Sequence, residues 1–253
     1  MTSQEYEKTI LEIVNLLRYN KTVDEYSRYE MCNNLYTLLL QYYDSGKGEK
    51  KLEIELKAVK HAIISLIPLL ETIVEKCEEK YMAKYYELWE KSYAFAGRRS
   101  LEHFIHYMEL DKPKKVLPDR LCVLKPFIFY LNKSMFDHSL KLICASYSPS
   151  TGKSFCANYY SAWALGVKED GSILRISYSE ELVLGFSRSI KEIILNPRFS
   201  DVFPRFKKYG RKPFDKEKES DWKIKDANTL KSHIARTRDG STTRRKSKNS
   251  HYS

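Results

Sequence analysis

The sequence lacks any pair of closely spaced cysteines. Its five cysteines are scattered over 253 residues, and none belongs to a C-x-x-C pair. An odd, unpaired set argues against a disulfide framework or a zinc site and favours a reducing compartment. The sequence also lacks a long apolar run: the stretch from Ala62 to Leu70 is too short to span a bilayer, and no apolar segment near the N-terminus resembles a signal peptide. We therefore expect a soluble, cytoplasmic protein with no membrane partner.

The sequence has little net charge outside its C-terminal end. The whole chain carries a formal charge of +11. Residues 205–253 hold sixteen Lys or Arg and six Asp or Glu, so the preceding part is close to neutral. The basic character is therefore only weak evidence for a DNA-binding face on a folded domain. Short strands are expected at residues 221–225 and 233–237. Residues 244–253 show no apolar periodicity and predict a disordered basic tail.

Residues 1–96 carry a helical pattern. The first part predicts two helices, the second of them capped by Thr22 with Glu25 reaching back to it. From residue 49 onward, apolar residues alternate spacings of four and three, which is typical of a heptad seam. Pro68 falls inside this seam and should kink or split the helix. The seam fits either a coiled coil between chains or, as we favour, packing within the chain's own bundle. Its members are Leu52, Leu56, Val59, Ile63, Leu66, Leu70, Ile73 and Cys77.

Gly152, Lys153 and Ser154 form a G-K-S triplet between an apolar run, Leu142–Ala145, and a helical pattern that ends near Gly166. The apolar run predicts a buried parallel strand, and Gly166 predicts a helix C-cap. In a strand–loop–helix of this kind, the glycine lets the backbone approach phosphates, the lysine reaches the β and γ oxygens, and the serine hydroxyl binds Mg²⁺. The free amides and the dipole of the helix N-terminus also favour an anion.

The predicted phosphate cradle is completed by the backbone amides of Ser150 and Thr151. The full nucleotide-binding pattern has a glycine where this sequence has Tyr147. The alternative interpretation is an ordinary strand–turn–helix with a surface lysine.

Four further segments follow the loop in a characteristic order. They are Ala162-Trp163-Ala164-Leu165-Gly166, Tyr178-Ser179, Phe186-Ser187-Arg188, and Pro197 to Pro204. Together with the G-K-S loop they resemble the ATPase domain of tailed-phage large terminases, the DNA-packaging motors, over roughly residues 98–240. The resemblance implies an α/β fold, with an incomplete P-loop NTPase-like parallel sheet core preceded by an all-α N-terminal region. Strands of that sheet are expected at residues 142–145 and 173–179.

The resemblance also implies cofactors, partners and domain limits. ATP and Mg²⁺ would bind at the G-K-S loop, and double-stranded DNA, the portal and the small terminase subunit would be partners in a bacterial host cytoplasm. Oligomers would form only in the intact protein. Residues 1–96 would be a helical N-terminal region, residues 97–243 a partial P-loop ATPase domain, and residues 244–253 a tail.

The acidic strand that ATP hydrolysis requires is missing from the sequence. Hydrolysis needs an acidic residue at the end of an apolar strand to hold Mg²⁺ and a carboxylate to orient the attacking water. No apolar run of four after Ser154 ends in Asp or Glu. The nuclease domain of the large terminases is absent too. We therefore assign no catalytic residue and expect a truncated or frameshifted fragment that binds ATP without turning it over. The alternative is a non-enzymatic helical interaction protein whose nucleotide-binding loop is a relic.

Two other pairs of residues invite a functional interpretation. His103 and His106 stand at helical i, i+3 spacing and could share a metal, but no third ligand appears nearby at suitable spacing, so we favour a place on the surface or on an amphipathic helix face. Arg175 and Arg188 could stabilise phosphates, but each is better interpreted as a residue on a solvated face.

Overall fold

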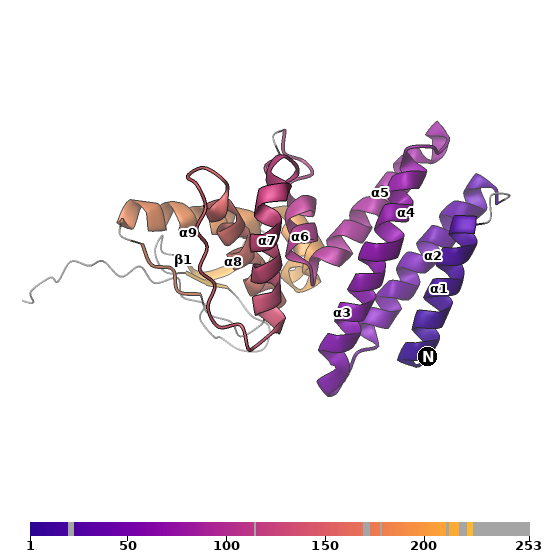
Figure 1. The fold of residues 1–253 in the computed structure, drawn as a ribbon, viewed down its shortest axis with the longest axis horizontal. Helices are drawn as coiled ribbons and strands as arrows, with labels where there is room; N and C mark the ends of the chain where they lie inside the picture. Colours follow the sequence, from indigo (N-terminus) through magenta and orange to yellow (C-terminus); the bar gives the residue numbers. More distant parts are fainter. Residues whose placement is uncertain are drawn as a thin grey trace, which may run out of the picture.

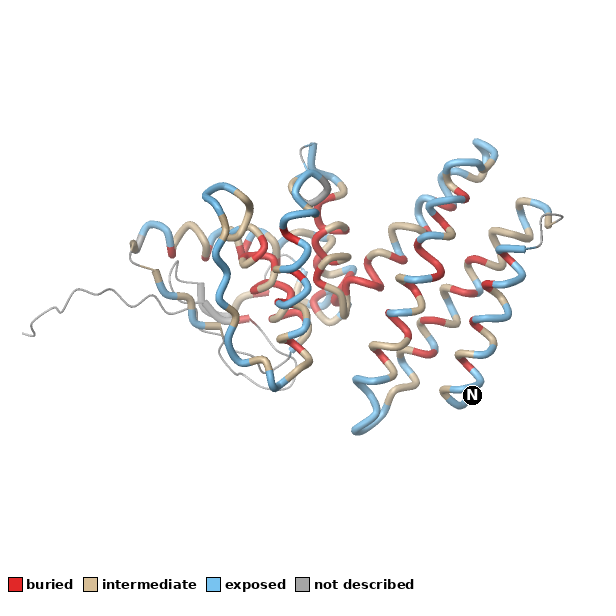
Figure 2. Tube along the Cα trace, in the orientation of Figure 1, coloured by how far each residue is buried: buried red, intermediate tan, exposed pale blue. Residues whose placement is uncertain are grey.

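Helices dominate the computed structural model of the chain, and they pack around two hydrophobic cores (Figure 1). One core lies in a bundle formed by α1 to α5, and the other lies among the end of α5 and the elements from α6 onward. Buried residues continue along α5, which connects the two (Figure 2). The structure describes residues 1–19, 23–113, 115–168, 173–177, 179–210, 213–217 and 222–224.

The N-terminal bundle is built from amphipathic helices that turn one apolar face inward. A 3₁₀ turn precedes α3, and a π-helical segment separates α3 from α4. The elements are α1 (Ser3–Tyr19), α2 (Glu25–Asp44), η1 (Gly48–Lys50), α3 (Lys51–His61), η2 (Ala62–Leu66), α4 (Ile67–Val74) and α5 (Glu79–Gly97).

Most of the heptad seam packs inside this bundle, as favoured from the sequence, but Leu52 at its start is exposed. Val59, Leu66 and Leu70 are buried in one core with residues of α1, α2 and α5. Pro68 splits the seam, as predicted: it lies in the first turn of α4, directly after the π-helical segment. Because proline has no N–H to bond the carbonyl one turn earlier, the regular helix cannot run through this position.

The predicted cap of α2 is wrong. The helix begins at Glu25, and its N-cap is Asp24, whose carboxylate accepts a hydrogen bond from the Ser27 amide. Asp24 stands three residues before that amide and so satisfies it directly, which is the usual N-cap arrangement. Thr22, the predicted cap, lies outside the described residues.

The second half of the chain is also mainly helical. No helix among the described residues is long and apolar enough to cross a lipid bilayer. The elements are α6 (Leu101–Met108), α7 (Leu117–Phe136), α8 (Lys153–Val167), α9 (Glu180–Leu195), α10 (Pro197–Val202), the 3₁₀ turn η3 (Pro204–Tyr209), β1 (Phe214–Glu217) and β2 (Trp222–Ile224).

The predicted parallel sheet core is wrong. The described residues contain one sheet, the antiparallel pair β1–β2. The two segments expected to be buried parallel strands are irregular, and they expose Leu142 (77%), Leu174 (61%) and Ile176 (65%) to solvent. An apolar run of four favours a strand only where another strand pairs with its backbone. The strand predicted at 233–237 and the tail at 244–253 lie outside the described residues.

The segment from Pro197 to Pro204 builds the second core. Asn196 caps α10 by accepting a hydrogen bond from the Arg198 amide, and Pro197 takes the first helical turn, where its missing N–H costs nothing. Phe199 and Phe203 are buried and pack against each other with ring centroids 5.0 Å apart.

Gly166 does not end α8, contrary to the sequence prediction. The helix continues to Val167, and the Phe203 ring lies against Gly166 so closely that a Cβ would overlap it. Gly166 is therefore needed for close packing between α8 and the segment after α10, rather than for a left-handed C-cap.

We predict that Gly166→Ala destabilises the fold by about 1–3 kcal/mol, because the added methyl group must displace the buried Phe203 ring. Gly185 is a matched control, since it also lies in a helix but a Cβ added there would have no atom within 4 Å. Gly185→Ala should stabilise by about 0.5–1 kcal/mol through helix propensity. Urea unfolding of both variants measures the difference, and equal shifts for the two would contradict this account of Gly166.

His103 and His106 lie on α6 against the Tyr93 ring of α5, with ring centroids 5.5 and 6.1 Å away. The Ser100 hydroxyl is 2.8 Å from Nδ1 of His103. Burial, with a smaller contribution from His106, lowers the pKa of His103 from 6.5 to about 4. Burial also lowers the pKa of His106. Both rings therefore favour the neutral form in the folded protein.

The lowered pKa of His103 predicts acid sensitivity. Between pH 6.5 and pH 4, the unfolded chain binds a proton at this position that the folded chain does not. The free energy of unfolding should therefore fall as the pH falls through this range, with a contribution of up to about 1.4 kcal/mol per pH unit from this group. His103→Gln should reduce the slope by about one proton. An unchanged slope in His103→Gln, measured by denaturant unfolding across this range, would refute the assignment.

Candidate functional site

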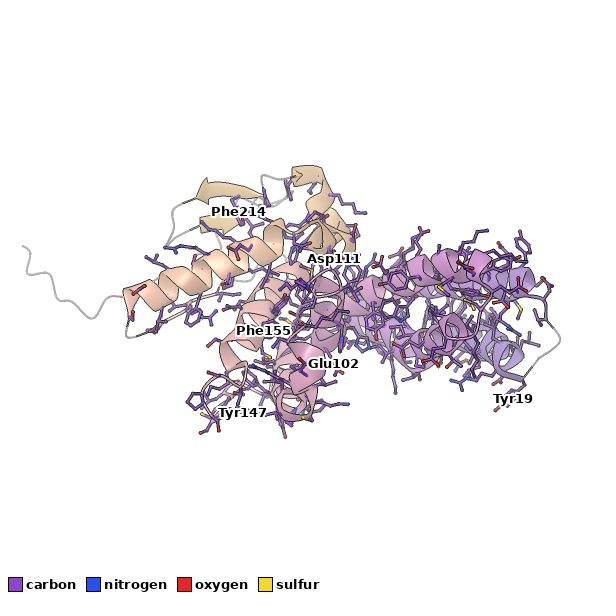
Figure 3. All side chains as sticks on the ribbon, turned by 90° about the horizontal axis from the view of Figure 1, so that it is seen from above. Tyr19, Glu102, Asp111, Tyr147, Phe155 and Phe214 are labelled. Carbon is purple, nitrogen blue, oxygen red and sulfur yellow. The ribbon has the colours of Figure 1, made fainter. Side chains whose placement is uncertain are left out.

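The segment after α7 turns back along that helix to reach the G-K-S loop. The Tyr147 ring lies 6.0 Å from the Phe127 ring, and the Arg120 guanidinium donates to the Ser150 carbonyl oxygen. Leu124 lies directly beside Gly152. These contacts place the loop along the first half and the middle of α7. Figure 3 shows Tyr147 and Phe155 on the same half of the molecule, far from Tyr19 at the end of α1.

The backbone of the loop takes a left-handed conformation at two positions. Ser150 has φ of 61°, which is uncommon for a residue other than glycine, and Gly152 has φ of 105°. Gly152 is the N-cap of α8 and offers no side chain to its first amides. A Cβ here would also lie 3.1 Å from the Leu124 side chain. The loop therefore requires glycine at this position and leaves the helix N-terminus open to an anion.

Lys153 folds over the loop that precedes it. Its ammonium group donates to the carbonyl oxygens of Tyr147 and Ser148, the second at 3.2 Å. The Thr151 hydroxyl donates to the same Ser148 oxygen at 3.0 Å. These bonds place the lysine charge beside the positive end of the α8 dipole, where a phosphate group would be attracted by both.

The structure thus gathers the predicted site residues at one turn. Ser150 and Ser154 are exposed, and Thr151, Gly152 and Lys153 are half-buried. No group of three or more His, Cys, Asp or Glu side chains that could hold a metal lies within the described residues. The turn therefore fits an anion, while Ser154 contributes only its own hydroxyl toward Mg²⁺.

Arg175 is not on a solvated face, contrary to the sequence interpretation. Its guanidinium lies between α8 and α9, where it donates to the Asn158 side chain and stacks 4.0 Å from the centre of the Phe186 ring. Burial lowers the pKa of Arg175. Its interactions tie two helices together, which indicates a structural role.

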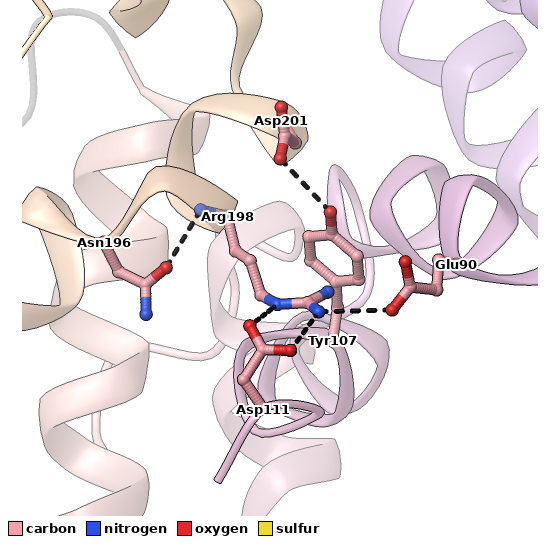
Figure 4. Close-up of polar contacts among 6 residues, drawn as sticks. All are labelled: Glu90, Tyr107, Asp111, Asn196, Arg198 and Asp201. Atoms are coloured by element: carbon pink, nitrogen blue, oxygen red, sulfur yellow. Dashed lines mark hydrogen bonds and ion pairs between the residues drawn. The ribbon is translucent and has the colours of Figure 1, made fainter. Parts of the chain in front are cut away.

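An arginine that the sequence did not single out joins a polar cluster between α5, α10 and the segment after α6. Arg198 of α10 binds both oxygens of Asp111, donates to Glu90 of α5 at 3.1 Å, and stacks 4.8 Å from the Tyr107 ring (Figure 4). Hydrogen bonds to Asp111, offset by burial and strengthened by Glu90, raise the pKa of Arg198. The Pro197–Pro204 motif contained this residue, but its partners lie about 90 to 110 positions earlier in the chain, so spacing alone could not reveal the cluster.

A groove opens at the end of the bundle that is distant from the second core. We call it the distal groove; its volume is about 370 Å³. Arg18, Arg28 and Lys76 contribute positive charge, and Glu25 pairs with Arg28 at 3.8 Å. The second oxygen of Glu25 is buried without a hydrogen-bond partner among the described residues. The groove is lined by Leu17, Arg18, Glu25, Arg28, Pro68, Leu69, Thr72, Ile73, Lys76 and Cys77.

Comparisons with known proteins assign no function to this chain. No family model, no curated protein and no solved structure matches the chain. The similarity to large terminases therefore depends on the quoted sequence segments alone, and it carries expectations rather than an assignment.

Proposed function

We propose that this chain is a non-enzymatic helical interaction protein whose N-terminal bundle binds an acidic, amphipathic segment of a partner protein. The observation that carries the proposal is the composition of the distal groove. Its floor is apolar, with Leu17, Leu69 and Ile73, and its rim is basic. An apolar floor with charges of one sign around it favours a partner helix with an apolar face and acidic flanks.

The charges of the distal groove favour an acidic occupant over a basic one. Three cations face one carboxylate, and that carboxylate is already engaged by Arg28. The unsatisfied Glu25 oxygen can accept a hydrogen bond from an amide N–H, such as one at the start of the partner helix. A partner helix of this kind would cover the apolar floor of the groove, pair with its cations and donate a hydrogen bond to the Glu25 oxygen.

The interaction proposal predicts binding of a synthetic helical peptide with leucine on one face and glutamate on the other. Affinity should weaken as salt increases. The double variant Arg18→Glu/Lys76→Glu should lose roughly tenfold in affinity, since two favourable exposed charge pairs become repulsive. Both side chains are exposed, so the fold should tolerate the change.

Fluorescence anisotropy of the labelled peptide measures this binding. The matched control is Lys60→Glu, an exposed change on α3 outside the groove, which should leave the affinity unchanged. A peptide with lysine in place of glutamate should not bind. Equal affinity for the acidic and basic peptides, or no loss in the double variant, would refute the proposal.

A second candidate function is nucleotide binding at the G-K-S loop. Two observations favour it: the left-handed Gly152 opens the amides of α8, and Lys153 is held beside them. This loop would bind the phosphates of ATP without catalysing hydrolysis. A role in DNA packaging, with double-stranded DNA, the portal and the small terminase subunit as partners, is a further proposal that requires such binding and is supported by the sequence resemblance alone.

The second candidate predicts that ATP binds weakly and is not turned over. Lys153→Ala should abolish the binding measured by calorimetric titration, because it removes the only lysine held in the described loop. Lys168→Ala, at the other end of the same helix, is the matched control and should bind as the unmodified protein does. Equal binding by both variants would reject the loop as the site. Steady Mg²⁺-dependent phosphate release that disappears in Lys153→Ala would reject the non-enzymatic interpretation.

A further inference from the structure

A second cavity lies where the bundle meets the second core. We call it the junction cavity; its volume is about 350 Å³. Its walls come from the ends of α2, α5 and α8, the start of α3, and the segment after α10. The lining residues are Tyr43, Asp44, Gly46, Lys51, Glu55, Arg98, Arg99, Gly166, Val167, Val202, Phe203, Pro204 and Arg205.

Positive charge exceeds negative charge in the junction cavity. Four cationic side chains line it, against the carboxylates of Asp44 and Glu55. Glu55 is only 5% exposed and accepts two hydrogen bonds from Arg99, at 3.1 and 2.5 Å. Arg205 donates to the carbonyl oxygens of Leu165 and Lys168, so part of its guanidinium is engaged by the backbone at the C-terminal end of α8.

Arg98 differs from these two arginines. Its guanidinium stacks on the rings of Tyr43 and Phe95, 5.4 and 5.5 Å from their centres. Its Nε atom is buried and has no hydrogen-bond partner among the described residues. Arg99 also lies near the Tyr43 ring, 5.8 Å from its centre. The unfilled N–H of Arg98, next to the guanidinium of Arg99, favours an oxyanion, because a buried donor without an acceptor loses its hydration without compensation.

The remaining wall of the junction cavity is apolar. Phe203 is 6% exposed, and Pro204, Val202 and Tyr43 extend this surface. A bare phosphate ion would leave most of the 350 Å³ unfilled. A ligand with a phosphate at one end and a compact ring at the other would match both parts of the wall.

We propose that the junction cavity binds a small phosphomonoester with an aromatic or similarly compact apolar group. Its phosphate lies against Arg98, with Lys51 at the entrance, and its apolar group packs on Phe203 and Pro204. Residues of both cores then contact one ligand, so binding stabilises the arrangement of the bundle relative to the second half of the chain.

Titration of the full chain with phenyl phosphate, inorganic phosphate and phenol, at constant ionic strength, tests this proposal. Phenyl phosphate should bind most tightly and raise the melting temperature, inorganic phosphate should bind more weakly, and phenol should not bind. Arg98→Gln should weaken phenyl phosphate binding by about tenfold or more. Lys51→Gln changes an exposed side chain, so it tests the same site in a variant that keeps the buried packing.

Two control variants separate this cavity from the rest of the molecule. Lys60→Gln alters the same helix as Lys51 outside the cavity, and it should bind phenyl phosphate normally. Lys153→Ala removes the lysine of the G-K-S loop and should also bind normally. Loss of binding in Lys153→Ala but not in Arg98→Gln would assign the phosphate to the loop and overturn the proposal. Equal binding of phenol and phenyl phosphate would overturn it as well, since charge would then play no part.

Discussion

The indole N–H of Trp163 donates to the carbonyl oxygen of Gly97 at 2.7 Å, and the second half of the fold depends on this contact. Trp163 is fully buried in α8, and Gly97 is the last residue of α5. The absence of a side chain at Gly97 also allows α6 to approach, because a Cβ there would lie 3.1 Å from the Phe104 backbone. One bond thus joins the helix that leaves the bundle to the helix at the centre of the second core. An indole buried without this acceptor would cost about 1–3 kcal/mol.

The helices could be predicted from the sequence, and the parallel sheet could not be excluded from it. Apolar residues in α1, α6 and α9 recur at helical spacing, and that periodicity is a local property of each segment. Strand formation in residues 142–145 and 173–177 depends instead on a partner far away in the chain. The apolar runs are present, but no described strand pairs with them. Leu142, Leu174 and Ile176 are exposed, and Ile143 and Ile173 are only partly buried against the second core. The sequence predicts a strand where β2 lies. It does not predict the partner strand β1, in which three of the four residues are charged.

The candidate sites also differ in how far the sequence predicts them. The position of Lys153 at the start of a helix and the backbone freedom of Gly152 follow from a contiguous motif, so the sequence was sufficient to predict the turn. The Arg198 cluster, the distal groove and the junction cavity each combine residues from several helices. Only the helix packing brings these residues together. Gly166 illustrates the limit, since its sequence position suggested a cap while its neighbour in space, Phe203, gives the physical reason for glycine.

Arginine and lysine side chains make different kinds of contact in this structure, and this difference bears on the role of Arg98. Several of the described lysine ion pairs join exposed residues one turn apart on the same helix, where they contribute little; they include Lys8–Glu12, Lys57–Glu53 and Lys91–Glu87. Several arginines instead bridge separate parts of the fold: Arg198 joins α10 to α5, Arg99 joins the turn after α5 to α3, and Arg205 joins η3 to the end of α8. The planar guanidinium suits this task because its donors reach several acceptors in fixed directions. Arg98 stands at the same kind of junction with a buried donor that no described acceptor fills, and an oxyanion bound in the junction cavity would supply that acceptor.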